Sequence, residues 1–151
     1  MYPTLKPGQQ LLVVRDTTFT SAYRRSEILV ILDPNHPNNA FIKRVVGLPG
    51  DNLIMQDGSL YLDGRHVIEP YLNGTPSAPE SIYYEWTLKT NEYVVLGDNR
   101  SHSTDSRQYG PIHLKSIVGK VWLRYWPPHQ LGQVNSKNQQ LIESDLATSL
   151  E

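Results

Sequence analysis

Short apolar runs separated by turn residues recur along the chain. Five of these runs are rich in β-branched and aromatic residues, and they cover residues 11–15, 28–32, 40–46, 93–96 and 117–125. Turn-forming residues bound each run, which favours strands over helices. The 11 prolines and 10 glycines are spread along the chain, so the segments between them are too short for long helices. We therefore predict strands at these five positions.

A second group of short runs follows residue 52. Asp57-Gly58 lies between the apolar residues 53–55 and 60–62, and Asp63-Gly64 comes directly afterwards. An Asp-Gly pair between apolar stretches is typical of a tight β-hairpin. From about residue 69 to residue 91, four turn signals indicate a loop-rich stretch with one or two short strands: Pro70, Asn73-Gly74, Pro76 and Pro79.

These patterns predict a mainly β fold whose core is a hairpin-rich sheet or a partly open barrel. We assign residues 1–56 and 92–128 to this core, and residues 57–91 to a small inserted region of β structure and loops. Residues 129–151 lose the strand pattern and are predicted to form a polar, mobile tail. A short helix over residues 139–147 is the alternative for part of that tail.

Composition narrows the classes of function. A chain of 151 residues with 38% hydrophobic and 19% charged residues is typical of one folded domain. Its net charge of −1 gives no general attraction to nucleic acid, and we predict no nucleic-acid partner. The absence of cysteine excludes a disulfide framework and a thiolate zinc site. The sequence contains no apolar run of about 18 residues that would span a bilayer.

Two cations interrupt the apolar run at residues 40–46. Strand alternation places Lys43 with Val45 on one face, and it places Arg44 with Ile42 and Val46 on the other. One interpretation is an edge strand whose charges prevent aggregation, and this segment alone favours it. The other is a desolvated lysine whose pKa falls from about 10.4 toward neutrality, so that it can act as a general base.

A polar loop at residues 97–110 directly follows another apolar run. The loop is dense in hydroxyl, carboxylate, amide and guanidinium groups. Such residues are typical of turns, but a plain turn needs only a few of them. A polar network that includes Asp105 and Arg107 would instead orient catalytic groups. The loop by itself leaves both interpretations open.

The five histidines are scattered, and they are His36, His66, His102, His113 and His129. Their spacings match no metal-ligand motif, so we predict no metal ion and no other cofactor. A Ser-His-Asp site built from Ser103, His102 and Asp105 stays open, although no pattern marks it. We favour ordinary surface histidines.

Taken together, four stretches in order resemble the type I signal peptidases of bacteria, thylakoids and the mitochondrial inner membrane. Met1-Tyr2-Pro3-Thr4-Leu5 is similar to the family's box Ser-Met-x-Pro-Thr-Leu, and residues 25–30 stand where the family has Arg-Gly-Asp and an apolar strand. Residues 43–51 match the lysine box, and residues 97–110 match the final box. Gln9 and Glu27 depart from the family pattern, since Ser26-Glu27 and Gly8-Gln9 stand where Gly-Asp is common.

The resemblance implies a serine endopeptidase with a Ser/Lys dyad that removes signal peptides from exported proteins. In that family a serine hydroxyl attacks the scissile carbonyl while a neutral lysine takes its proton. Lys43 then matches the general base and Ser103 the residue that orients it. The residues that match the family's structural support are Asp98, Asn99, Asp105 and Arg107. The residues that match its apolar pocket for small side chains are Met1, Leu5, Phe41 and Ile42.

The family's nucleophilic serine matches the position immediately before Met1. We therefore expect the 151 residues to lack the nucleophile and to be inactive as given. The family's membrane anchor also lies upstream of that position. The full-length protein is expected to be anchored in membrane lipid with its catalytic part on the extracytoplasmic side, and the chain as given to be soluble. Replacement of the nucleophile by Ser21, Ser26 or Ser59 would need a geometry that the family does not use.

Two other functions stay open. One is a non-catalytic β-barrel module that binds an extended peptide beside residues 11–15 and 40–46. The other is a repressor-type, self-cleaving Ser/Lys protease, which shares the dyad chemistry. We rank it lower because residues 43–51 and 97–110 should not take these forms in such a protein.

Overall fold

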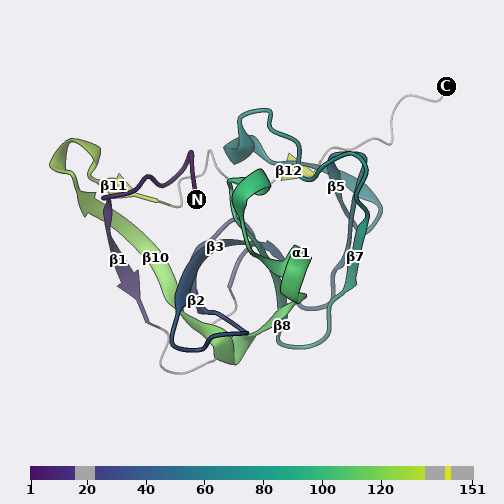
Figure 1. Cartoon of the computed structure of the whole chain (residues 1–151), viewed down its shortest axis with the longest axis horizontal. Coiled ribbons are helices and arrows are strands. Elements are labelled where there is room, and N and C mark those ends of the chain that lie inside the picture. Colours follow the sequence, from purple (N-terminus) through teal and green to yellow (C-terminus); the bar gives the residue numbers. More distant parts are fainter. Residues whose placement is uncertain (16–22, 135–141, 144–151) are drawn as a thin grey trace.

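A computed structural model describes residues 1–15, 23–134 and 142–143 (Figure 1). The described strands form a seven-stranded sheet with the order β1-β10-β2-β3-β8-β9, in which β11 also pairs with β10, and a five-stranded sheet with the order β12-β6-β5-β4-β7. All pairs are antiparallel. The predicted mainly β fold is therefore confirmed, with open sheets and no closed barrel.

The larger sheet contains all five strands that the apolar runs predict. Its strands are β1 (Gln10–Val14), β2 (Ile28–Leu32), β3 (Ala40–Gly47), β8 (Glu92–Leu96), β9 (Ile112–His113), β10 (Ile117–Trp126) and β11 (Gly132–Gln133). The short helices are η1 (Pro70–Leu72), η2 (Arg100–His102), α1 (Ser106–Tyr109), η3 (Leu114–Ser116) and η4 (Pro128–Gln130).

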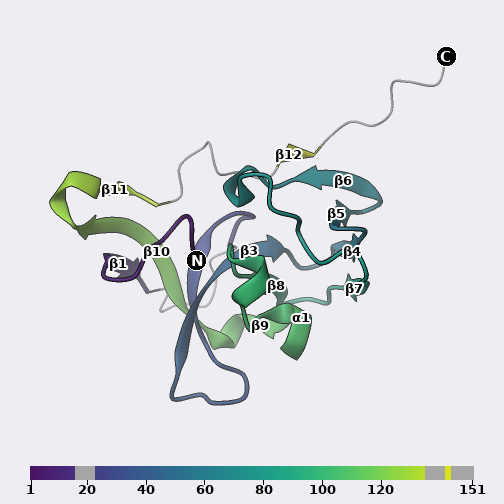
Figure 2. The ribbon, with the colours of Figure 1, turned by 45° about the horizontal axis from the view of Figure 1, so that its top comes forward.

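The second sheet lies to one side of the larger one and is built mainly from consecutive hairpins (Figure 2). Its strands are β4 (Asn52–Gln56), β5 (Ser59–Leu62), β6 (Arg65–Ile68), β7 (Tyr84–Thr87) and β12 (Ile142–Glu143). Both predicted Asp-Gly hairpins are confirmed, because the Asp and the Gly of each pair have the positive φ angles that a two-residue turn of this kind requires.

Strand β4 pairs with β5 and β7, so it lies in the second sheet rather than in the core segment to which the sequence assigned it. The physical reason is its alternation, because Leu53 and Met55 are fully buried in a cluster with Leu60 and Trp86 of the same sheet. The division of the chain into a core and an inserted unit stays a prediction.

The tail predicted at residues 129–151 lies largely outside the described residues. Its first part forms η4 and β11. Of the alternative helix over 139–147, residues 142–143 are described, and they form β12 against β6 rather than a helical turn.

Strand β3 contributes to all three apolar clusters of the described chain. Val46 packs with the second sheet, and Val45 packs with Leu29 and Val95 of the larger sheet. Ile42 packs against a third cluster, which includes Leu5. β3 therefore lies where the three clusters meet, and it carries Lys43 and Arg44.

Candidate active site

The two cations of β3 lie where the strand gains its second neighbour. β2 pairs with β3 over residues 40–44 and β8 pairs with it from Arg44 onward. Both cations are buried, so the interpretation of Lys43 and Arg44 as solvent-exposed edge charges is wrong, although up to Lys43 the described part of β3 is paired with β2 alone. Arg44 is fully buried and Lys43 is 9% exposed. Burial of a cation costs free energy unless the charge is paired or lost. Each of these two side chains must therefore either find a counter-charge or lose its proton.

Lys43 lies against the hydroxyl of Ser103, to which its Nζ donates a hydrogen bond of 2.9 Å. The ring of Phe41, two residues earlier on the same face, lies 5.3 Å from Nζ. Burial lowers the pKa of Lys43 below its usual value, Asp105 opposes this and Arg107 adds to it. A larger neutral fraction is what a lysine needs in order to accept a proton.

The close approach of Ser103 depends on Gly97, at the end of β8. A Cβ atom on Gly97 would lie 2.2 Å from Ser103 Oγ and 3.7 Å from Lys43 Nζ. The contact of 2.2 Å is too short for real atoms, so a side chain here would displace Ser103, whereas 3.7 Å from the lysine is an ordinary contact. The glycine therefore creates the space in which the serine reaches the lysine.

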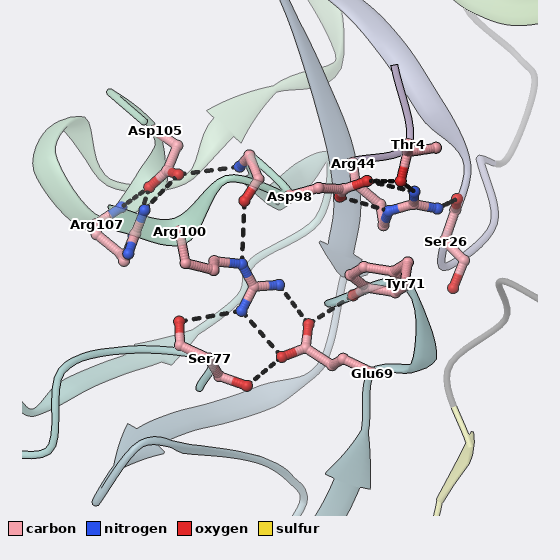
Figure 3. A network of polar contacts seen from close by, with 11 residues as sticks. Thr4, Ser26, Arg44, Glu69, Tyr71, Ser77, Asp98, Arg100, Asp105 and Arg107 are labelled. Atoms are coloured by element: carbon pink, nitrogen blue, oxygen red, sulfur yellow. Dashed lines mark hydrogen bonds and ion pairs between the residues drawn. The ribbon is translucent and has the colours of Figure 1, made fainter. Parts of the chain in front are cut away.

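Asp105 and Arg107 hold the same loop from the other side (Figure 3). The buried carboxylate of Asp105 accepts the Gly97 N–H at 3.0 Å, and Arg107 Nε at 2.8 Å and Nη2 at 2.9 Å. Burial on its own would raise the pKa of Asp105, but hydrogen bonds from Arg107, Gly97 and Ser103 bring it below its usual value. Asp105 stays ionised and fixes the position of Gly97.

The buried charge of Arg44 is instead compensated by an ion pair with Asp98. Its Nε and Nη2 donate to the two carboxylate oxygens at 2.8 and 2.6 Å, and its Nη1 donates to the Ser26 carbonyl at 2.8 Å. Thr4 donates its hydroxyl to the same Asp98 carboxylate, as Figure 3 shows. The bidentate pair, in which all three guanidinium nitrogens of Arg44 donate hydrogen bonds, compensates for the burial of its charge.

Three of the four residues predicted for the apolar pocket lie together. Met1, Leu5 and Ile42 line a hollow of about 380 Å³, whose wall also includes Asn99. Phe41 lies on the opposite face of β3, beside Lys43. The structure thus brings together the predicted base, its orienting serine and Phe41 on one face of the strand, and the other pocket residues on the opposite face.

The histidine of the alternative triad lies elsewhere. His102 is exposed, and its Nδ1 lies 3.0 Å from Ser101 Oγ, whereas Ser103 Oγ accepts from the lysine. The geometry therefore favours lysine over histidine as the base beside Ser103. Among the residues that the structure describes, no cluster of three His, Asp or Glu side chains could hold a metal ion.

Comparison with known proteins decides the family. The sequence model described as "Signal peptidase, peptidase S26" matches residues 1–126. The signal peptidase I of Bacillus licheniformis is 34% identical over 139 residues, which are 87% of this chain and 74% of the relative. The chain belongs to the type I signal peptidase family. Signal peptidase IB of Staphylococcus aureus is 33% identical over 91% of this chain and 81% of that protein.

A solved signal peptidase I from Enterococcus faecalis shares the fold. It superposes with a TM-score of 0.58 at 27% identity, over 66% of this chain and 97% of that one. The relatives are serine endopeptidases by family, and the family acts on preproteins that carry signal peptides.

Sequence reasoning assigned no role to several residues that contact the candidate site or its loop. They are Thr4, Arg44, Glu69, Gly97 and Arg100. Arg44 offered a signal, because the strand alternation required one of the two cations to face the interior. Glu69 offered none, since its partner is 31 residues away in a different element.

Proposed function

We propose that these residues form the base half of a Ser/Lys endopeptidase that removes signal peptides from exported preproteins. The observation that carries this proposal is the hydrogen bond of 2.9 Å between Lys43 Nζ and Ser103 Oγ, on a buried face where the pKa of the lysine is lowered by desolvation. Ser103 orients the amine, so that its lone pair is free for a second hydroxyl.

That second hydroxyl belongs to a serine directly before Met1 in this proposal. Its oxygen attacks the scissile carbonyl carbon while Lys43 takes its proton, and the carbonyl π electrons move to oxygen. The tetrahedral intermediate collapses, the peptide C–N bond breaks, and Lys43 returns the proton to the leaving amine. Water then hydrolyses the acyl ester with Lys43 as base. Residues 1–151 supply the base and not the nucleophile, so alone they are expected to be inactive.

The substrate is an extended peptide with small side chains before the cleaved bond. We place a small apolar side chain of this peptide in the hollow beside Met1, Leu5 and Ile42, whose lining is partly apolar. β8 pairs with β3 only from Arg44 onward, so the first half of β3 offers an edge for strand addition near Lys43.

The proposed membrane association comes from an anchor upstream of Met1. No helix in the described part of the chain is long and apolar enough to cross a bilayer. We place the catalytic face on the extracytoplasmic side, where signal peptides of exported proteins emerge.

The test adds Ser and a few upstream residues ahead of Met1 and measures cleavage of a signal-peptide substrate. We expect activity in this extended chain, its loss in Lys43→Ala, and retention in Lys89→Ala, a matched change at an exposed lysine. Full activity of Lys43→Ala would eliminate the dyad.

The same extended chain and variants distinguish the endopeptidase from a non-catalytic peptide-binding module. If the extended chain binds an Ala-x-Ala peptide, with chemical-shift changes at β1 and residues 40–43, but never cleaves it, the binding module is the better description.

A further inference from the structure

The loop that follows β6 carries a buried carboxylate that the proposed chemistry does not use. Glu69 is 7% exposed and accepts hydrogen bonds from Tyr71 Oη at 2.5 Å and from the Ser77 hydroxyl. Both Nη atoms of Arg100 also donate to it. Because all of these groups are buried together, the cluster is a fixed feature of the interior and not a solvated surface pair.

Arg100 connects this cluster to the loop that holds the candidate site. Its Nε donates to the Gly97 carbonyl at 3.1 Å, while its Nη1 donates to Glu69 at 2.9 Å and to the Ser77 carbonyl at 3.1 Å. Figure 3 shows the guanidinium between Glu69 and the loop. One planar group thus spans the distance between the segment after β6 and the end of β8.

Gly97 is therefore held at both of its backbone polar groups. Asp105 accepts its N–H at 3.0 Å, and Arg100 donates to its carbonyl. The same residue leaves the space into which Ser103 fits beside Lys43. A rotation of the Gly97 backbone would move the Asp105 contact and close that space together.

Glu69 and Arg100 both stay charged, so their ion pair persists. Burial on its own would raise the pKa of Glu69, but the Arg100 charge and the three donors bring it below its usual value. Arg100 stays charged, since the attraction of Glu69 outweighs its burial. The Tyr71 ring also lies 4.0 Å from the Arg44 guanidinium, so the cluster contacts the second buried ion pair as well.

We propose that Glu69 is a positioning residue for the signal peptidase site, which acts through Arg100 on the Gly97 backbone and so sets the approach of Ser103 to Lys43. This inference rests on the proposed Ser/Lys function. It assigns to the segment after β6, outside the motifs that match the family, a direct part in holding the catalytic loop.

A purely structural role makes a different prediction. If Glu69 and Arg100 only stabilise the segment after β6, their loss would weaken the second sheet and leave Gly97 as well protected as the rest of the larger sheet. The two roles are separated by hydrogen exchange of individual amides, which measures local opening.

The first experiment uses the 151-residue chain and needs no activity. We compare Glu69→Gln with Glu85→Gln, a matched change at an exposed carboxylate of the second sheet. In Glu69→Gln the Gly97 N–H should exchange at least about tenfold faster relative to the amides of β4, because a hydrogen bond to a charged group contributes at least that factor. Glu85→Gln should leave the ratio unchanged. An unchanged ratio in Glu69→Gln overturns the proposal.

Arg100→Lys serves where Glu69→Gln does not fold. Lysine keeps a cation for Glu69, but its single nitrogen cannot also span to the Gly97 carbonyl. The same faster exchange at Gly97 is expected, with the amides of β4 nearly unchanged. Equal protection of Gly97 in the parent and in Arg100→Lys contradicts the coupling.

The second experiment measures kinetics in the chain extended by the serine before Met1. Glu69→Gln and Arg100→Lys should lower kcat by about tenfold or more with little change in KM, since the base is misplaced and the apolar hollow is intact. A rise in KM alone would contradict positioning. If Lys43→Ala proves fully active, the dyad fails, whereas the Gly97 exchange ratio still decides the coupling.

Discussion

Replacement of Gly97 by alanine is the smallest change that should disable the site. The added Cβ would lie 2.2 Å from Ser103 Oγ and 2.7 Å from Ser103 Cβ, whereas non-bonded carbon atoms rest at about 3.5–4.0 Å. Gly97 is not among the glycines with positive φ, so an alanine backbone is allowed there and the effect is steric. The Ser103 side chain must move by about 1 Å, which breaks its hydrogen bond with Lys43.

The magnitude follows from what that hydrogen bond orients. General base catalysis contributes about 10²–10⁴-fold, and a base that is present but misplaced loses the lower part of this range, so we expect kcat to fall about a hundredfold. Overpacking should cost about 1–3 kcal/mol of stability. Kinetics of the extended chain and urea unfolding measure the two effects. Gly132→Ala is the matched control, because nothing lies within 4 Å of its added Cβ.

A double variant tests whether the alanine acts through Ser103. In Ser103→Gly the clashing atoms are gone, so Gly97→Ala should cost little further activity or stability in that background. If Gly97→Ala alone leaves kcat unchanged, or if its effects add fully to those of Ser103→Gly, the steric reasoning is refuted.

Three further predictions follow from the same contacts. Ser103→Ala should lower kcat more than it raises KM, because Ser103 orients the base without holding substrate; an unchanged kcat in steady-state kinetics would contradict this. The folded-state pKa of Lys43 lies below its unfolded value of about 10.4, so the unfolded chain binds more protons between the two values, and the free energy of unfolding should rise with pH across that window. Urea unfolding over a pH series should show this slope reduced in Lys43→Met, and identical slopes would count against a desolvated lysine. Arg44→Met should destabilise the fold by about 3–5 kcal/mol, because it leaves the Asp98 carboxylate buried without its cation. Arg24→Met, at an exposed arginine, is the control, and equal unfolding midpoints for the two variants would argue against the buried pair.

The strands of the larger sheet could be predicted because their signal is local. β-branched residues between turn formers prefer a pleated surface whatever their partners are, as in residues 28–32 and 93–96. The pairing of β3 could not be predicted in the same way. Whether a strand is central or at an edge depends on which distant segments pair with it, and the burial of Lys43 and Arg44 follows from that pairing.

In the candidate site, too, local contacts could be predicted from the sequence and long-range contacts could not. Asp105 and Arg107 are two residues apart, so their contact could be expected from the sequence. The contact of Lys43 with Ser103 joins residues 60 apart, and that of Arg44 with Asp98 joins residues 54 apart. The spacing of two residues along the chain does not predict a contact at such separations. The family resemblance predicted the contact of Lys43 with Ser103 but not that of Arg44 with Asp98. The sequence showed Gly97 only as part of a motif. Its role could not be predicted, because that role is to leave space for the Ser103 side chain.

Lys43 and Arg44 show why one strand carries two different buried cations. Arginine keeps its charge at any accessible pH, and its planar fork can use several acceptors, so Arg44 is stable only where Asp98 and the Ser26 carbonyl meet it. Lysine has one nitrogen and can lose its proton, so Lys43 meets a neutral hydroxyl and an aromatic ring. Exchange of the two residues would put a permanent charge beside Ser103 and a single donor beside Asp98. The order Lys-Arg on β3 therefore separates a group that must titrate from a group that must not.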